Sequence, residues 1–498
     1  MSQTLDIIKD KTLTYHQQVF NLAREAENSV SPLMVSDRLL RLKEEGVICD
    51  LFEGQAPYRP RYIIPDYSRL MSSGCEFLRI NAPRDIWEAT HALLIFYKHV
   101  PSIDYFPVYL GNLDTLLQPF IKDEEEARKA IRLFLEHIDR TLTGSFVHAN
   151  VGPEESPAGR IIVETVRDMD CAIPNLTLKY DKDKTSDSFL NLCCASALST
   201  AKPSFANHSI YSSEFSFSGY AIASCYNGLP LAGGGYTLVR LRLNTLAEQA
   251  KSLDHYLEQL LPEAASEQLA YMDERIRFLN EESGFFESSF LVQEGFIRQD
   301  RFTGMFGLVG LAEAVNLLME KEGQAGRFGS DARADETGLT VIKKLSELVE
   351  SHHSPYVGCF DGRHLLHAQV GIDNDKGSSP GCRIPVGEEP ETLPHILQSA
   401  PFHKYFPSGT GDIFVFDQTW KNKPEALADI VRGAMASGLR YFSAYSEDCD
   451  VVRVTGYLVK RSEMDKLDQG KAVLNQSTIL GLGIRRDGDA FNRPVRAK

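Results

Sequence analysis

Near the C-terminus the chain reads Val451-Val452-Arg453-Val454-Thr455-Gly456-Tyr457-Leu458-Val459, and this stretch decides the fold. Its residues suit a β-strand, yet Gly456 lies inside it. A glycine weakens a strand because it has no side chain to pack and loses more backbone freedom on folding. One interpretation is therefore a bulge or a close backbone approach. The other is chemical: a glycine Cα, with two hydrogens and no side chain, can hold a planar radical that its amide and carbonyl delocalise.

A backbone radical needs a relay that passes hydrogen to and from a substrate. A thiol suits this role because its S–H bond has a similar strength, whereas a hydroxyl O–H bond is too strong. Nine cysteines are present, and most are expected to be small buried hydrophobes. Cys225 differs, because a short apolar strand runs into it, a Gly- and Pro-containing loop follows, and a second strand at residues 236–243 leads away. The pattern predicts Cys225 at the exposed tip of a strand-loop-strand finger.

Several of these motifs resemble those of the glycyl radical enzymes. Residues 453–457 resemble their R-V-x-G-Y signature, and residues 220–225 resemble the Y-A-I-x-x-C run around their thiyl cysteine. Upstream, residues 174–180 resemble the strand P-N-L-T-x-x-Y, and residues 203–207 resemble the turn P-x-F-x-N. Motifs in the same order and spacing are more specific than any single match. The resemblance implies a radical on Gly456 and a thiyl relay at Cys225.

Further residues receive roles from the same resemblance. The radical-loop residues Arg453, Val454, Thr455 and Tyr457 are expected to pack and orient the loop without carrying electrons. The candidate substrate contacts are Ser224, Tyr226, Asn227, His148, Asn150 and Asn207. For His148 and Asn150, which lie in a Gly- and Pro-bounded turn, a purely hydrogen-bonded turn is the alternative interpretation.

The residues around the finger tip distinguish branches of this superfamily. Acyl-transferring members carry two adjacent cysteines there, whereas Ser224 precedes Cys225 in this chain. The pair Cys193-Cys194 lies in a stretch with helical spacing and is interpreted as helix core. Asn227 stands where dehydratases and decarboxylases often have a glutamate base, and an amide can orient a substrate oxygen but cannot take its proton. Acyl transfer and carboxylate-assisted elimination are therefore disfavoured.

The C-terminal third is similar to the anaerobic ribonucleotide reductases at residues 306–314, 403–412 and 424–442. Those enzymes usually place two C-x-x-C pairs for zinc before the glycyl loop. Only Cys449 lies there in this chain and no C-x-x-C occurs, so neither a metal site nor a regulatory nucleotide-binding domain is expected. The overall motif order is closest to the YjjI-type glycyl radical proteins, on residues 47–50, 107–111, 148–153 and 224–227.

Composition excludes several classes of partner. The net charge is −15 and no basic block occurs, which argues against nucleic acid. No run approaches the roughly 18 apolar residues that span a bilayer. The first twenty residues lack the apolar core of a signal peptide. Unpaired cysteines in a long chain without such a signal fit a cytoplasmic protein.

Alternating patterns predict an α/β fold. Helices are predicted at residues 123–141, 246–261, 267–281, 302–322 and 339–351, and strands at 161–166, 175–180, 411–416 and 440–444. His364 and His367 have the i, i+3 spacing of metal ligands if that segment is helical, but no third ligand lies nearby. The resemblance implies a ten-stranded α/β barrel with two interior finger loops. It divides the chain into a barrel with a helical N-terminal part, residues 1–435, and a glycyl radical domain, residues 436–498.

The function implied is radical chemistry on a small polar substrate. A separate activating enzyme with S-adenosylmethionine and a 4Fe–4S cluster would generate the Gly456 radical. The protein that carries this radical would be oxygen-sensitive. The leading interpretation is a lyase or dehydratase reaction. A radical reductase with an external electron donor and a catalytically silent binding protein are the alternatives. Such enzymes are commonly homodimers, and the substrate does not follow from the sequence.

Overall fold

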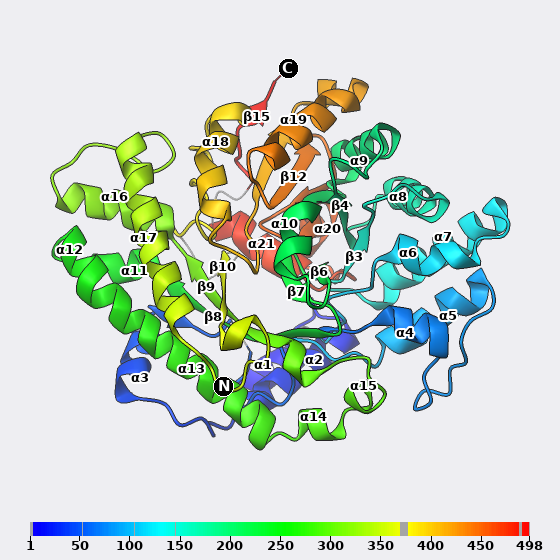
Figure 1. The fold of residues 1–498 in the computed structure, drawn as a ribbon, viewed down its shortest axis with the longest axis horizontal. Coiled ribbons are helices and arrows are strands. Elements are labelled where there is room, and N and C mark those ends of the chain that lie inside the picture. The colour runs from blue at the N-terminus through cyan, green and yellow to red at the C-terminus, as the bar shows by residue number, and fades with distance from the viewer. Residues whose placement is uncertain are drawn as a thin grey trace.

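The computed structural model describes residues 3–51, 53–103, 105–144, 146–368, 377–487 and 491–497. Within them helices and strands are mixed along the chain (Figure 1), which confirms the predicted α/β class. The described strands pair into two main sheets and two short hairpins. No helix among the described residues is both long enough and apolar enough to cross a membrane.

The first sheet has the order β1-β8-β9-β10, and β2 also pairs with β8. Its strands are β1 (Ile48–Cys49), β2 (Tyr62–Ile64), β8 (Gly233–Arg242), β9 (Phe302–Val309) and β10 (Leu365–Ala368). Strands β8, β9 and β10 are parallel, whereas β1 and β2 pair antiparallel to β8. All residues of β9 and β10 are buried, as expected for parallel strands covered on both faces.

The second sheet has the order β15-β11-β12-β5-β4-β3. Its strands are β3 (His148–Val151), β4 (Asn175–Tyr180), β5 (Ser204–Asn207), β11 (Asp412–Phe416), β12 (Tyr441–Ser446) and β15 (Val495–Arg496). β3, β4 and β5 are parallel to one another, and β12 is parallel to β11 but antiparallel to β5. β12, from the predicted domain 436–498, therefore shares a sheet with strands of the predicted domain 1–435, and that division stays a prediction.

Helices lie on the outer sides of both sheets. The longer ones are α2 (Tyr15–Glu27), α5 (Ile86–Tyr97), α7 (Glu124–Thr141), α8 (Pro157–Met169), α9 (Asp187–Thr200), α13 (Leu261–Glu281), α16 (Leu311–Lys321), α17 (Ala332–Ser351), α18 (Thr392–His403), α19 (Pro424–Ala436) and α21 (Thr478–Asp487). Figure 1 shows α13 and α17 beside β8–β10, with α16 farther out against α17, and α8, α9 and α19 beside β3, β4 and β12. Shorter helices include α10 (His208–Glu214), α11 (Leu243–Glu248), α12 (Leu253–His255) and α20 (Arg461–Asp468).

Helix α7 illustrates how local sequence sets these elements. The Asp123 carboxylate accepts a hydrogen bond from the Glu126 amide at 2.8 Å, and acidic residues fill the first turn. Both features stabilise a helix N-terminus. Ile131, Phe134 and Ile138 form its buried face, and the predicted helix 123–141 is confirmed.

Three predicted elements differ from the structure. Residues 161–166 lie inside α8 and not in a strand, because Ser156 caps a helix that Pro157 begins and the apolar residues recur at helical spacing. Residues 302–322 are not one helix, since β9 ends at Val309 and α16 starts after Gly310, whose φ of 76° breaks the chain direction. The predicted helix 246–261 is also interrupted, between α11 and α12.

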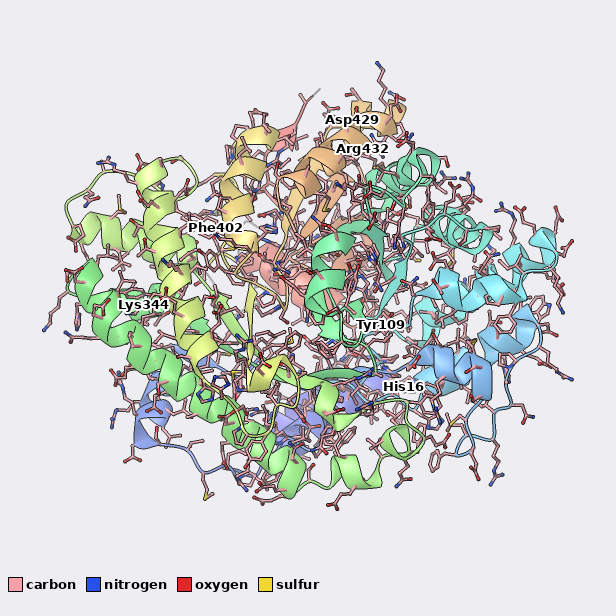
Figure 2. All side chains as sticks on the ribbon, in the orientation of Figure 1. His16, Tyr109, Lys344, Phe402, Asp429 and Arg432 are labelled. Atoms are coloured by element: carbon pink, nitrogen blue, oxygen red, sulfur yellow. The ribbon has the colours of Figure 1, made fainter. Side chains whose placement is uncertain are left out.

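Apolar packing joins the layers, and ion pairs also form at the surface. The rings of Phe328 and Phe402 contact edge to face at 5.5 Å between α18 and the segment before α17. Asp429 and Arg432 of α19 form a 2.7 Å ion pair at the surface, where Figure 2 labels both. The predicted strands 175–180, 411–416 and 440–444 agree with β4, β11 and β12 within a few residues. The predicted helices 267–281 and 339–351 end where α13 and α17 end, but those helices begin earlier, at Leu261 and Ala332.

Candidate active site

Cys225 lies at the tip of a hairpin between the two sheets. Its arms are β6 (Tyr220–Ala223) and β7 (Asn227–Pro230), which pair antiparallel. The second arm is thus β7, and not residues 236–243, which belong to β8. Ser224 turns the chain at the tip with a φ of 60°, a left-handed conformation that is uncommon for a residue other than glycine.

The predicted exposure of this tip is wrong. Cys225 is only 3% exposed, because the surrounding strands and loops bind the finger through its backbone. Asn150 on β3 both donates to the Ile222 carbonyl at 2.8 Å and accepts from the Ile222 amide at 2.9 Å. The Ser224 amide donates to the Val108 carbonyl at 3.2 Å. Asn150 therefore lies in a strand and not a turn, and it positions the finger.

Gly456 lies in a second buried loop. The predicted continuous strand is in fact a hairpin of β13 (Val451–Arg453) and β14 (Leu458–Lys460), with Gly456 in the connection. The Val454 amide donates to the Tyr457 carbonyl at 3.1 Å and closes that connection. Gly456 is thus neither a strand residue nor a bulge within one.

Charged and amide side chains hold the Gly456 loop. Asn175 on β4 donates to the Gly456 carbonyl at 3.3 Å and accepts from Arg453 at 3.0 Å. Arg453, which is 1% exposed, also donates to the Ala201 carbonyl at 2.9 Å. The ring of buried Tyr457 packs beside Phe146 at 5.4 Å. The loop conformation is therefore fixed from several sides.

Arg383 connects the two loops. Its Nη1 donates to the Thr455 carbonyl at 3.2 Å and its Nε to the Gly411 carbonyl at 2.5 Å. Its guanidinium carbon lies 5.5 Å from the ring centroid of Tyr226, within the range of a cation–π contact. One side chain thus contacts the residue before Gly456 and the residue after Cys225. No local sequence motif marks Arg383, so its place in the site does not follow from the sequence.

Polar side chains of the neighbouring strands β3, β4 and β12 lie beside the finger tip. His148 Nε2 lies 2.7 Å from the Thr177 hydroxyl, which lies 3.1 Å from the Tyr441 hydroxyl. Burial lowers the pKa of His148 to about 3, and the nearby Ser224 carbonyl offsets part of that effect. His148 is therefore neutral and adjacent to the finger. The Tyr441 ring in turn contacts the Tyr226 ring at 5.8 Å.

The Cys225 thiol keeps its hydrogen in this environment. Burial raises its pKa to about 11, so the thiol and not the thiolate is present at neutral pH. Its Sγ donates to Asn227 Oδ1 at 2.9 Å. Among the described residues the buried Asn227 Nδ2 has no hydrogen-bond partner. Asn227 therefore offers a donor directly beside the sulfur.

His367 on β10 offers an acceptor beside Tyr226. Its Nδ1 lies 3.1 Å from the Ser408 carbonyl, so Nδ1 carries the proton. Burial lowers its pKa to about 3, and Nε2 has no partner among the described residues. The ring lies 5.6 Å from that of Tyr226. The sequence analysis considered His367 only as a metal ligand with His364, which required a helix where β10 is a strand.

Other predicted residues have structural contacts. Asn207 Nδ2 donates to the carbonyls of Met435 and Leu439, each at 3.1 Å, and so holds the end of α19. Residues 204–207 form strand β5 and not the predicted turn. The Tyr226 hydroxyl donates to the Ala368 carbonyl at 2.5 Å. Cys193 and Cys194 are fully buried in α9, which confirms helix core.

Comparisons with known proteins agree with this arrangement. The family described as "Glycyl radical enzyme YjjI-like" matches residues 13–496. An uncharacterized protein of Haemophilus influenzae is 48% identical over 100% of this chain and 98% of its own length. The uncharacterized protein YjjI of Escherichia coli K12 is 44% identical, over 98% and 95%.

Solved structures share the fold at low identity. Hydroxyproline dehydratase from Clostridioides difficile has a TM-score of 0.69 at 12% identity, over 100% of this chain and 89% of its own. The anaerobic ribonucleotide reductase from Thermotoga maritima has 0.65 at 14%, over 87% and 85%. The B12-independent glycerol dehydratase from Clostridium butyricum has 0.63 at 11%, over 84% and 68%. The fold is that of these enzymes, and the chain belongs to the YjjI-like family of glycyl radical enzymes.

Proposed function

We propose that this protein carries its radical on Gly456 and uses Cys225 as a thiyl relay to a small polar substrate. The contact of Arg383 with both loops is the observation that carries this proposal. This contact supports a direct structural connection between the Gly456 loop and the finger that carries Cys225. The burial of both loops supports it too, since water-borne oxygen and reductants quench an exposed radical.

The proposed steps transfer one hydrogen atom at a time. A separate activating enzyme with S-adenosylmethionine and a 4Fe–4S cluster removes one Cα hydrogen from Gly456. The Gly456 radical takes the hydrogen of the Cys225 S–H bond, and the thiyl then takes a hydrogen from a substrate C–H bond. The product radical recovers a hydrogen from Cys225. The resulting thiyl then takes a hydrogen from the Gly456 Cα, which restores the Gly456 radical. The raised thiol pKa favours this sequence, because a thiolate has no hydrogen atom to give.

We further propose a lyase or dehydratase reaction on a hydroxylated substrate. Asn227 Nδ2 would donate to a substrate oxygen next to the reacting C–H bond, and His367 Nε2 would accept from a substrate hydroxyl. His367 is neutral and can therefore take a proton where Asn227 cannot. Solved neighbours named as dehydratases have this fold.

Electron paramagnetic resonance tests the radical assignment. The full-length protein is incubated without oxygen with a cognate activating enzyme, S-adenosylmethionine and reductant. We expect a doublet from one α-hydrogen in the wild type and none in Gly456→Ala. Air should then cleave the chain at Gly456, which mass spectrometry detects as a released C-terminal fragment. No doublet with a demonstrably competent activator would favour the binding-protein alternative.

Product analysis distinguishes the two enzymatic alternatives. Candidate diols and hydroxy acids are incubated with activated protein, with and without formate or a dithiol. A dehydratase forms a dehydrated product in both cases, because the reaction is redox-neutral. If product forms only when formate or the dithiol is present, and that donor is oxidised in stoichiometric amount, the protein is a reductase instead.

A further inference from the structure

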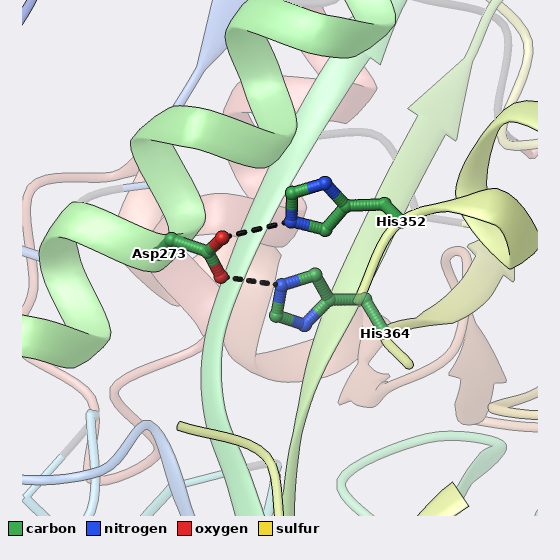
Figure 3. Close-up of side chains that lie close together, drawn as sticks. All are labelled: Asp273, His352 and His364. Atoms are coloured by element: carbon green, nitrogen blue, oxygen red, sulfur yellow. Dashed lines mark hydrogen bonds and ion pairs between the residues drawn. The ribbon is translucent and has the colours of Figure 1, made fainter. Parts of the chain in front are cut away.

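A group of three ionisable side chains takes no part in the radical site. Asp273 lies on α13, His352 is the C-cap of α17, and His364 directly precedes β10 (Figure 3). His352 Nε2 lies 2.8 Å from Asp273 Oδ2, and His364 Nε2 lies 3.0 Å from Asp273 Oδ1. One possible ligand atom from each residue lies within 4.8 Å of the other two. Both imidazoles thus direct the same nitrogen at one carboxylate.

The cluster is built into the fold on one side and open on the other. The His364 side chain is fully buried, whereas those of Asp273 and His352 are 20% and 30% exposed. A Cβ at Gly304 on β9 would lie 2.3 Å from His364 Nδ1, so the glycine makes room for the imidazole. The two imidazoles stack at 5.8 Å with an interplanar angle of 18°. An ion could therefore reach a site whose inner ligand is held in place.

Asp273 carries a charge without a strong cation beside it. In the described part of the chain its ion pairs go to His352 and His364, and to no lysine or arginine. An ion bound by this carboxylate would therefore be shared with the two imidazoles.

We propose that Asp273, His352 and His364 bind a divalent transition-metal ion such as Zn²⁺. Imidazole nitrogen and carboxylate oxygen are zinc ligands at about 2.0–2.2 Å, which places tetrahedral ligand atoms roughly 3.3 Å apart. The nitrogen–oxygen distances of 2.8 and 3.0 Å are close to that value, so small side-chain rotations make room for the ion. The exposed edge of the cluster provides a fourth position for water.

The ion would join three segments that are distant in sequence. It would tie α13 and the end of α17 to the start of β10. β10 continues to His367, whose ring contacts Tyr226, and to Ala368, whose carbonyl accepts from the Tyr226 hydroxyl. An ion held by three elements stabilises the folded chain, because the unfolded chain does not bring its ligands together.

Metal binding by the full-length protein tests this site. Chelator-treated wild type, Asp273→Asn, His352→Ala and His353→Ala are titrated with Zn²⁺ alone, and bound metal is measured after dialysis. His353 is the matched control, since it is exposed and its Nδ1 bonds to the Asp361 carbonyl. We expect the wild type and His353→Ala to bind one ion more than Asp273→Asn and His352→Ala. Zn²⁺ should raise the melting temperature of the wild type and of His353→Ala. It should not raise that of Asp273→Asn or His352→Ala.

The absorption spectrum of bound Co²⁺ distinguishes binding at this site from binding by any of the nine cysteine thiolates. Co²⁺ in the wild type should give visible bands of a nitrogen- and oxygen-ligated ion without the near-ultraviolet charge transfer of a thiolate. Melting of each variant without metal shows whether it is folded. Equal metal content in wild type and Asp273→Asn would overturn the proposal and leave a hydrogen-bonded Asp–His cluster. Loss of the ion in His353→Ala, or a thiolate spectrum, would overturn it as well.

Discussion

The finger tip and helix α9 both hold buried thiols, but their surroundings differ. Cys193 and Cys194 are fully buried among the apolar residues of α9, and burial raises the pKa of both. Cys225 is buried as well, but it contacts Asn227 and lies near Arg383 and Arg453. Burial and a raised pKa therefore do not identify a radical relay. What distinguishes Cys225 in the structure is its polar surroundings, at a finger tip that Arg383 links to the Gly456 loop.

Replacing the finger thiol should have the largest effect. In Cys225→Ser the O–H bond is too strong to give its hydrogen to the Gly456 radical. We expect turnover to fall by more than about 10³-fold, or roughly 4 kcal/mol of barrier, while the doublet persists. The measurement is product formation together with radical quantitation. Full activity would remove Cys225 from the mechanism and direct attention to α9.

Removing the Arg383 contacts that connect the two loops should have the second-largest effect on turnover. Arg383→Met keeps much of the side-chain length but loses the bonds to Thr455 and Gly411. We expect turnover per radical to fall by about 10²-fold, because small misplacements of reacting groups cost that much. Arg327→Met is the control, since Arg327 pairs with Glu388 at the surface. Equal activity in both variants would argue against a positioning role for Arg383.

The reactivity of Cys225 toward alkylating reagents, and its dependence on pH, should reflect a thiol that burial protects from deprotonation. Because burial raises the pKa of Cys225 to about 11, its hydrogen is retained below that pH and is lost only as the pH rises through it. A rise of about two pKa units lowers the thiolate fraction at pH 8 by roughly 10²-fold. Iodoacetamide should therefore label Cys49, which is only partly buried, before Cys225. Peptide mapping by mass spectrometry measures both rates, and faster labelling of Cys225 would contradict a protected thiol.

Removing the candidate acceptor should have a smaller effect. His367→Phe keeps a ring beside Tyr226 but has no acceptor nitrogen. We expect kcat to fall by about 10- to 10²-fold on any substrate found, with the doublet unchanged. His353→Phe serves as the exposed control. An effect on the melting temperature alone would make His367 a packing residue.

The α9 thiols should have the smallest effect on activity. Cys193→Ala removes a buried sulfur without touching either loop, so turnover and radical content should match the wild type. We expect a loss of about 1–2 kcal/mol in the free energy of unfolding, from the small cavity. Denaturant titration measures it. A large loss of turnover in a folded variant would make α9 part of the chemistry.

Local sequence predicted the parts of the site that lie in continuous motifs. Gly456 and Cys225 are predicted as radical and relay residues because each is surrounded by a short characteristic run, and these roles stay predictions. Helix α7 is confirmed, because its cap and acidic first turn are local. Arg383 and His367 were not identified as parts of this site. Their roles depend on contacts with Thr455, Tyr226 and Ser408, which are distant in the chain. The predicted exposure of Cys225 was wrong for the same reason, since β3 and the segment at Val108 cover the finger.

The sequence by itself predicts which atoms would carry the radical, because a glycine Cα has no side chain to block a planar radical and a thiol S–H bond is weak enough to exchange hydrogen with it. It also determined the family, through motifs kept in order along the chain. The tertiary structure decided that the two loops are buried, that Arg383 contacts both, and that Asp273, His352 and His364 converge. The physical reason is that bond chemistry belongs to single residues. Enclosure and ligand convergence arise only when distant segments pack together.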